Sequence, residues 1–176
     1  MPSNIYLIGP RACGKTTVGK FLADKLNLEF YDSDKVLVDK AGCEISEYVE
    51  LNGWDGFRDL EVEVLGYLAG KQGAVISCGG GIVIREENRA VLSNNFTVYI
   101  KTDVEILANR LMQDPNHDQR PSLTGKSIVD EIREVLEERE SLYSGCAAFI
   151  ADGAGTIENV CNQIIDSYQS CSKGEK

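Results

Sequence analysis

The sequence lacks the features that would place it in a membrane or a secretory pathway. Its 176 residues contain no apolar run long enough to span a bilayer. The opening residues, MPSN, are followed at once by a strand-like run, so neither the basic nor the apolar part of a signal or transit peptide is present. We therefore expect no membrane partner and a cytoplasmic location.

Positive charge is also scarce. Lysine and arginine number 18 against 28 aspartates and glutamates, which gives a formal net charge of −10 at pH 7. A broad surface for nucleic acid or anionic lipid needs the opposite balance, so we predict no nucleic-acid partner. An anionic small molecule could still bind, but only where a few of the arginines gather.

Histidine and paired cysteines are missing as well. The single histidine, His117, lies in a polar stretch and is predicted to be a solvated loop residue rather than a base or a ligand. Six cysteines, at positions 13, 43, 78, 146, 161 and 171, form no C-x-x-C pair and no cluster with histidine. This spacing argues against a zinc site or a disulfide framework and predicts reduced thiols.

Short apolar runs alternate with helical patterns along the whole chain. The runs at 5–8, 28–32, 74–78, 96–100 and 147–151 are typical of parallel strands covered on both faces. Helical spacing fills 15–26, 33–41, 45–51, 55–70, 86–93, 103–112, 127–143 and 156–169. We predict one α/β domain over residues 1–176, a five-stranded parallel sheet flanked by helices on both faces, and a monomer.

The segment GPRACGKTT, residues 9–17, has the spacing of a phosphate-binding loop. Gly9 and Gly14 allow a tight turn whose N–H groups cradle phosphate oxygens, Lys15 reaches the β- and γ-phosphates, and the Thr16 hydroxyl binds Mg²⁺. A chance glycine-rich turn is the alternative. The strand before the loop and the helix after it argue against chance, so we predict a P-loop ATP site with Mg²⁺. Within it, Cys13 is expected to be a small filler rather than a redox centre.

Three further segments follow predicted strands and should reach the same edge of the sheet. Asp32-Ser33-Asp34 follows the second strand, and its two carboxylates suit a metal's hydration shell and an acceptor hydroxyl. A plain helix N-cap with an acidic first turn explains the same triplet equally well. Gly79–Gly81 follows the third strand and favours close approach to a ligand over a loose turn. Asp152–Gly155 follows the fifth.

Two arginines lie on or beside apolar helical faces. Arg139 falls within the apolar stripe of the helix predicted at 127–143, and Arg58 lies four residues from both Trp54 and Val62. A buried arginine needs an anionic partner. That partner is either an internal carboxylate, of which this chain has many, or the carboxylate of a substrate, which the guanidinium fork suits. Because the segments that follow the strands are expected at one edge of the sheet, we favour a substrate carboxylate as the partner of these arginines.

The polar stretch from Gln113 to Lys126 reads as a long mobile loop between two helices, and such loops often act as lids. Arg120 within it is either a solvated charge or a lid residue that stabilises a transferring phosphoryl group. Arg110, just before the loop, either packs on adenine or complements a helix C-terminus. The tail from 170 to 176 is expected to be frayed.

Taken together, these segments resemble the shikimate kinase family, and the resemblance spans about residues 4–165. The matching pieces are GPRACGKTTVGK at 9–20, DSD at 32–34, GWDGFR at 53–58, CGGGIV at 78–83, LANRL at 107–111, RPSLTGK at 120–126 and EVLEERESLY at 134–143. The first piece is common to many nucleotide enzymes, whereas the full set is specific. The resemblance implies transfer of the γ-phosphoryl group of ATP to the 3-hydroxyl of shikimate.

The resemblance also implies a role for each matching residue. Asp34 would hold the reacting hydroxyl, and Lys15 and Arg120 would stabilise the phosphoryl group in transfer. The carboxylate and ring of shikimate would meet Arg58, Arg139, Gly79, Gly80 and Gly81, with Arg11 nearby. ATP would contact Arg11, Ala12, Cys13, Gly14, Lys15, Thr16, Thr17, Arg110, Arg120, Asp152, Gly153 and Ala154, the last three being the loosest match. Mg²⁺ would be held by Thr16 and, through water, by Asp32.

Two absences bear on the alternatives. The third strand ends Ile76-Ser77-Cys78 without the Walker B aspartate, so metal support falls on Thr16, Asp32 and water. The guanine-reading N-K-x-D pattern is also missing, which argues against a GTPase switch. A related small-molecule kinase, acting on gluconate or a nucleoside monophosphate, remains the nearest rival. A nucleotide-binding regulator without turnover is the other.

Overall fold

The computed structural model describes residues 4–113 and 127–173. Within them, five strands form one parallel sheet in the order β2-β3-β1-β4-β5. The strands are β1 (Ile5–Ile8), β2 (Glu29–Asp32), β3 (Ala74–Ser77), β4 (Phe96–Lys101) and β5 (Phe149–Asp152). Each of the five predicted strands is confirmed to within two residues at either end, and so is the fold class.

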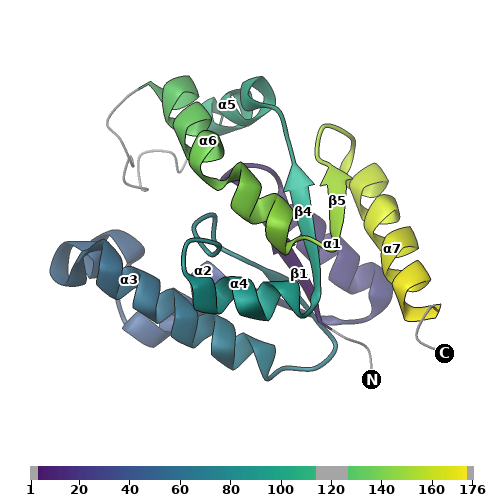
Figure 1. Ribbon diagram of the computed structural model, residues 1–176, viewed down its shortest axis with the longest axis horizontal. Helices are drawn as coiled ribbons and strands as arrows, with labels where there is room; N and C mark the ends of the chain where they lie inside the picture. The colour runs from purple at the N-terminus through teal and green to yellow at the C-terminus, as the bar shows by residue number, and fades with distance from the viewer. Residues whose placement is uncertain (1–3, 114–126, 174–176) are drawn as a thin grey trace.

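Seven helices connect the strands in the described part of the chain. They are α1 (Lys15–Leu26), α2 (Ser33–Ala41), α3 (Ile45–Ala69), α4 (Glu86–Ser93), α5 (Val104–Met112), α6 (Ile128–Cys146) and α7 (Ile157–Lys173). In Figure 1, α3 and α4 lie on one side of the sheet and α1 and α7 on the other. This arrangement is the doubly wound α/β architecture of P-loop proteins.

The central strand β1 shows why both faces need a cover. All four of its residues are buried, and successive side chains point to opposite faces. Ile5 and Leu7 pack with α1, α5 and α7, whereas Tyr6 and Ile8 pack with α2, α3 and α4. The sheet therefore separates two apolar clusters, and its strands read as continuous apolar runs for that reason.

Helix α3 merges the two helices predicted at 45–51 and 55–70. Gly53 lies between them with φ 70° and ψ 174°, a non-helical conformation that marks a sharp kink. Only glycine adopts such a backbone without strain, so the predicted break is confirmed as a kink rather than a gap. The second half of α3 carries Arg58, and the kink sets its direction.

Helix α7 runs to Lys173, past the predicted end at 169. The tail predicted to be frayed from residue 170 therefore begins inside this helix, and its fraying stays a prediction. Residues 174–176 lie outside the described part of the chain. None of the helices built from described residues is both long and apolar enough to cross a membrane.

Candidate active site

The phosphate-binding loop joins β1 to α1 and has the backbone that the motif requires. Gly9 and Gly14 have φ values of 142° and 102°, and Ala12 takes a left-handed φ of 64°. Gly14 caps α1 without a side-chain hydrogen bond, so no side chain occupies the first amides of the helix. A helix N-terminus of this kind attracts an anion.

Lys15 is buried inside this loop. Its Nζ donates to the carbonyl oxygens of Gly9 at 2.9 Å and Pro10 at 2.8 Å and lies 3.6 Å from the Cys13 Sγ. These contacts hold the ammonium group over the concavity of the loop, where it can meet phosphate oxygens. Cys13 itself is 2% exposed and belongs to the apolar core, as expected of a filler.

Oxygen ligands gather where the loop meets β2 and β3. The Thr16 Oγ1 donates to the Asp32 Oδ2 at 3.0 Å and lies 3.4 Å from the Ser77 Oγ. Hydroxyl and carboxylate oxygens with room for water are what Mg²⁺ prefers. No cluster of three or more histidine, cysteine or acidic side chains occurs in residues 4–113 and 127–173, so a metal here would keep several waters.

Ser77 was not among the residues expected at this point. It occupies the end of β3, where the Walker B aspartate is missing. A serine hydroxyl at a strand end carries no distinctive sequence signal, because serine is common there for many reasons. Only the pairing of β3 with β1, which sets Ser77 beside Leu7, brings it to Thr16.

The two carboxylates of the DSD segment have different environments. The Asp32 Oδ1 accepts from the Asp34 backbone N–H at 3.1 Å, so Asp32 is the N-cap of α2. The N-cap interpretation is thus confirmed, and it coexists with the contact to Thr16. Asp34 lies in the first helical turn and reaches the glycine turn instead: a Cβ added to Gly79 would lie 2.6 Å from the Asp34 Oδ1.

The glycine turn, residues 79–81, is enclosed by site residues. The Gly79 N–H donates to the Ser33 Oγ at 2.9 Å, and the backbone of Arg11 lies beside Gly80. A Cβ on Gly81 would collide with the Arg58 guanidinium. Within the chain, the side chains that approach these glycines closely are Asp34 and Arg58. Close approach of a ligand to this turn stays a prediction.

The sequence left open whether Arg58 pairs with an internal carboxylate, and the structure shows such a partner in Glu61. Its Nη1 lies 2.5 Å from the Glu61 Oε2, and both side chains are nearly buried. The guanidinium also lies 5.5 Å from the Trp54 ring and 5.1 Å from the Phe57 ring. Glu61 went unnoticed in the sequence, although an acidic residue three positions after an arginine on a helix is a recognised pairing signal.

Burial raises the pKa of the Glu61 carboxyl above its ordinary value. The Arg58 guanidinium opposes this rise, whereas the nearby Asp34 carboxylate adds to it. Two carboxylates and an arginine therefore share one desolvated corner. A cluster of interacting charged groups of this kind is typical of functional sites.

Arg139 reaches the same turn from α6. Its Nη1 donates to the Gly80 carbonyl oxygen at 3.3 Å, and its Nε is buried with no hydrogen-bond partner in the described residues. Buried guanidinium nitrogens without partners are uncommon in folded proteins and are found where a ligand completes the site. Arg58 and Arg139 thus approach the glycine turn from two different helices.

Arg110 ties the phosphate loop to the loop after β5. Its Nη1 donates to the carbonyl oxygens of Ala12 and Cys13 at 3.3 and 3.4 Å, and its Nη2 donates to the Gly153 oxygen at 3.0 Å. The Asp152 Oδ1 accepts from the Ala154 N–H at 2.9 Å and closes that loop. The segment 152–154 therefore does lie beside the P-loop, as the order of the strands requires.

The remaining predicted residues are less informative. Thr17 is exposed in the first turn of α1, and Arg11 is half-buried beside Gly80. Arg120 and nearly all of the predicted lid, residues 114–126, lie outside the described part of the chain.

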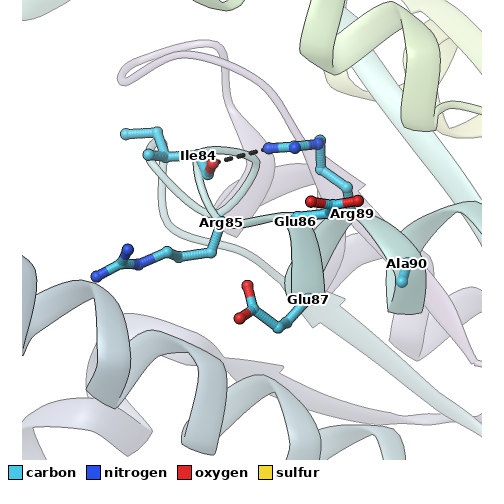
Figure 2. A pocket seen from close by; sticks show the side chains of 6 residues that line it. All are labelled: Ile84, Arg85, Glu86, Glu87, Arg89 and Ala90. Atoms are coloured by element: carbon cyan, nitrogen blue, oxygen red, sulfur yellow. Dashed lines mark hydrogen bonds between the residues drawn. The ribbon is translucent and has the colours of Figure 1, made fainter.

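A separate surface hollow lies at the start of α4, lined by Ile84, Arg85, Glu86, Glu87, Arg89 and Ala90. Figure 2 shows the hydrogen bond from Arg89 to the Ile84 carbonyl oxygen, and the Arg85 side chain extending away from Arg89. The Arg85 Nη2 donates to the Asp59 Oδ1 of α3 at 2.9 Å. None of the predicted site residues lines this hollow. Arg89 donates to the Val83 and Ile84 carbonyl oxygens, and the partners of Arg85, Asp55 and Asp59, belong to α3. The predicted site residues gather at the strand ends instead.

Comparison with known proteins agrees with this geometry. A model of the shikimate kinase family matches residues 11–169. The shikimate kinase of Nitratidesulfovibrio vulgaris is 42% identical over 161 residues, which cover 91% of this chain and 92% of that protein. The structure of a shikimate kinase from Acinetobacter baumannii in complex with shikimate superposes with a TM-score of 0.88 at 34% identity, covering 99% of this chain and 96% of that one.

The rival kinase class is more distant. A gluconokinase from Sinorhizobium meliloti superposes with a TM-score of 0.60 at 14% identity, covering 98% of this chain and 95% of that one, and so shares the fold alone. The family match extends over most of the sequence and includes residues 11–17 of the phosphate loop and both arginines at the glycine turn. The chain belongs to the shikimate kinase family.

Proposed function

We propose that this protein transfers the γ-phosphoryl group of ATP to the 3-hydroxyl of shikimate, giving shikimate 3-phosphate and ADP. It is a phosphotransferase with an alcohol as acceptor. The observation that carries the choice of acceptor is the approach of Arg58 and Arg139 to one glycine turn beside Asp34. Two guanidinium groups can bind the carboxylate of a small acid, and the Asp34 carboxylate can accept a hydrogen bond from a hydroxyl of the same acid.

On the donor side, the loop amides from Ala12 to Thr17 would cradle the phosphates of ATP. Lys15 would swing from the Gly9 and Pro10 carbonyls to the β- and γ-phosphates. Arg110 and the 152–154 segment would border the adenine. Arg11 would serve both substrates, because it belongs to the phosphate loop and its backbone lies beside Gly80 of the glycine turn.

The oxygens of Thr16 and Asp32, the latter through water, would hold Mg²⁺, with Ser77 beside them. The ion, when bound, would neutralise part of the charge on the β- and γ-phosphates. The hard oxygen donors fit that ion and no soft metal.

On the acceptor side, Arg58 and Arg139 would bind the shikimate carboxylate, with the Gly79–Gly81 backbone against the ring. Asp34 would accept the proton of the 3-hydroxyl while the oxygen of that hydroxyl forms a bond to the γ-phosphorus. The bond from that phosphorus to the β,γ-bridging oxygen breaks, and ADP leaves with the electron pair. Lys15 would stabilise the charge that develops on the phosphoryl oxygens.

The role of Arg120 rests on the sequence alone. It would close over the γ-phosphate from the lid predicted at 113–126. The monomeric state likewise remains a prediction from the sequence.

The decisive experiment is ADP release from Mg·ATP by the purified protein, with shikimate, gluconate, AMP or no acceptor. Release that requires shikimate supports the proposal, and phosphorus NMR of the product would establish the position of the phosphate. Release driven equally well by gluconate would support the rival kinase. Nucleotide binding without acceptor-dependent release would support a regulator.

A further inference from the structure

Tyr143 lies against the glycine turn but has no part in the roles assigned above. It belongs to α6 and is completely buried. Its hydroxyl donates to the Gly80 carbonyl oxygen, the same oxygen that accepts from the Arg139 Nη1. One backbone carbonyl therefore joins a buried phenol to an arginine of the acceptor site.

The ring of Tyr143 is itself held in place. It stacks on the Tyr99 ring of β4, with centroids 5.1 Å apart and an interplanar angle of 25°. The Tyr99 hydroxyl donates to the Glu140 Oε2 at 2.5 Å, and Lys101 Nζ donates to the Glu140 Oε1 at 2.7 Å. Since Tyr99 and Lys101 belong to β4 while Glu140 and Tyr143 belong to α6, this cluster fixes the helix to the central sheet.

Burial also determines what the phenol can do. It raises the pKa of the Tyr143 hydroxyl to about 12, against the opposing effect of the Arg139 guanidinium. The group therefore stays protonated at neutral pH and donates its hydrogen bond permanently.

A permanent donor matters at this position because the turn is made of glycines. Glycine peptides rotate freely unless something holds them. In a trans peptide the C=O and the following N–H point in opposite directions. Fixing the Gly80 carbonyl towards α6 therefore turns the Gly81 N–H away from α6.

We propose that Tyr143 is a positioning residue for the acceptor, whose hydroxyl holds the Gly80 carbonyl and thereby orients both the glycine turn and the Arg139 guanidinium. The inference rests on the proposed function, in which these two features bind the acid substrate. Loss of the hydroxyl should weaken acceptor binding and leave the nucleotide side unchanged.

The test compares Tyr143→Phe with Tyr99→Phe. Each variant removes one buried hydroxyl from the same stacked pair, but only the first hydroxyl contacts the glycine turn. For Tyr143→Phe we expect the KM for shikimate to rise about three- to tenfold, the range for one lost hydrogen bond, while the KM for ATP stays unchanged. For Tyr99→Phe the ring stack and the Lys101–Glu140 contact still hold α6 to the sheet, so both constants should stay within about twofold of the parent. Calorimetric titration of shikimate without ATP should reproduce the difference.

A Michaelis constant does not depend on the fraction of enzyme that is folded, so the result can be read even if a variant is less stable. An unchanged shikimate KM in active Tyr143→Phe would overturn the inference, as would an equal rise in both KM values or an equal effect of the two variants. Absence of shikimate-dependent ADP release in the parent protein would instead overturn the proposed function itself.

Discussion

Arg58 and Glu61 form a buried ion pair, one turn apart on α3, with the Arg58 Nη1 2.5 Å from the Glu61 Oε2. The side chains are only 11% and 4% exposed, so neither charge is well solvated. The pair holds the guanidinium against the glycine turn while the turn leaves no room for a side chain at Gly81. In the proposed function, the substrate carboxylate would be a second partner of this arginine beside Glu61.

Replacing Glu61 by glutamine should show what this pair contributes. The amide keeps the shape but loses the charge-assisted bond, so we expect the free energy of unfolding to fall by about 1–3 kcal/mol. The KM for shikimate should rise, because Arg58 is no longer held in place, and the KM for ATP should stay constant. Glu63→Gln is the matched control, since Glu63 is 62% exposed in its contact with Lys40. A lower shikimate KM in Glu61→Gln would mean that Glu61 competes with the substrate rather than positioning Arg58.

Gly81→Ala should damage the acceptor site directly. The new Cβ would collide with the Arg58 guanidinium and force it to move. We expect at least a tenfold rise in the shikimate KM by steady-state kinetics, with ATP binding retained. Gly66→Ala on the exposed side of α3 has nothing within 4 Å and should stabilise the protein by about 0.5–1 kcal/mol. Normal acceptor kinetics in Gly81→Ala would show that Arg58 does not need its observed position.

Asp32→Asn should separate the metal role of this residue from its capping role. Asparagine caps a helix about as well as aspartate, so stability should change by less than about 0.5 kcal/mol. The Mg²⁺ concentration for half-maximal activity should rise several-fold, because one negative charge is lost beside Thr16. Asp39→Asn, on the exposed surface of α2, serves as the control. A metal dependence identical to that of the parent would remove Asp32 from the proposed Mg²⁺ site.

Asp34→Asn should stop the chemistry without preventing nucleotide binding. An amide cannot accept the proton of the acceptor hydroxyl, so kcat should fall by about a hundredfold or more. Calorimetry should give an ATP affinity close to that of the parent, since the Asp34 carboxylate lies beside Gly79 in the proposed acceptor site. Turnover near the parent level would refute the assignment of Asp34.

Stability should fall in alkaline solution. Burial raises the pKa of the Cys161 thiol from 9.0 to about 11, and it also raises the pKa of the Cys78 thiol. The folded state then holds these protons more tightly than the unfolded state does. The contribution of each thiol is fully present below pH 9. That of Cys161 is lost as the pH rises through 9 to 11, and that of Cys78 continues to fall above this range, each at up to about 1.4 kcal/mol per pH unit.

Urea unfolding at pH 7, 9 and 10 measures this slope. In Cys161→Ala, the slope of the unfolding free energy against pH should be smaller by the contribution of one proton, whatever the stability of the variant at pH 7. A free energy of unfolding that stays constant up to pH 10 would contradict the assignment of buried, protonated thiols.

Much of the fold followed from local patterns in the sequence. The continuous apolar runs of β1 and β3 indicated strands covered on both faces, and the helical spacing indicated two separate helices at 45–51 and 55–70, which the structure joins at a kink. The spacing of Gly9, Gly14 and Lys15 indicated the phosphate loop, because that turn needs glycine at fixed positions. These features depend on neighbours close in sequence, where periodicity and backbone geometry are sufficient.

The partners of each site residue were decided only by the tertiary structure. Ser77 reaches Thr16 because β3 pairs with β1, and Tyr143 reaches Gly80 because α6 packs over the strand end. Such contacts join residues more than sixty positions apart, and nothing in either residue's local sequence specifies the other. The sequence by itself determined which chemical groups the protein carries to the edge of the sheet. The packing of the helices on the sheet decided which of these groups meet, because a hydrogen bond depends on the distance between two atoms in space and not on their separation along the chain.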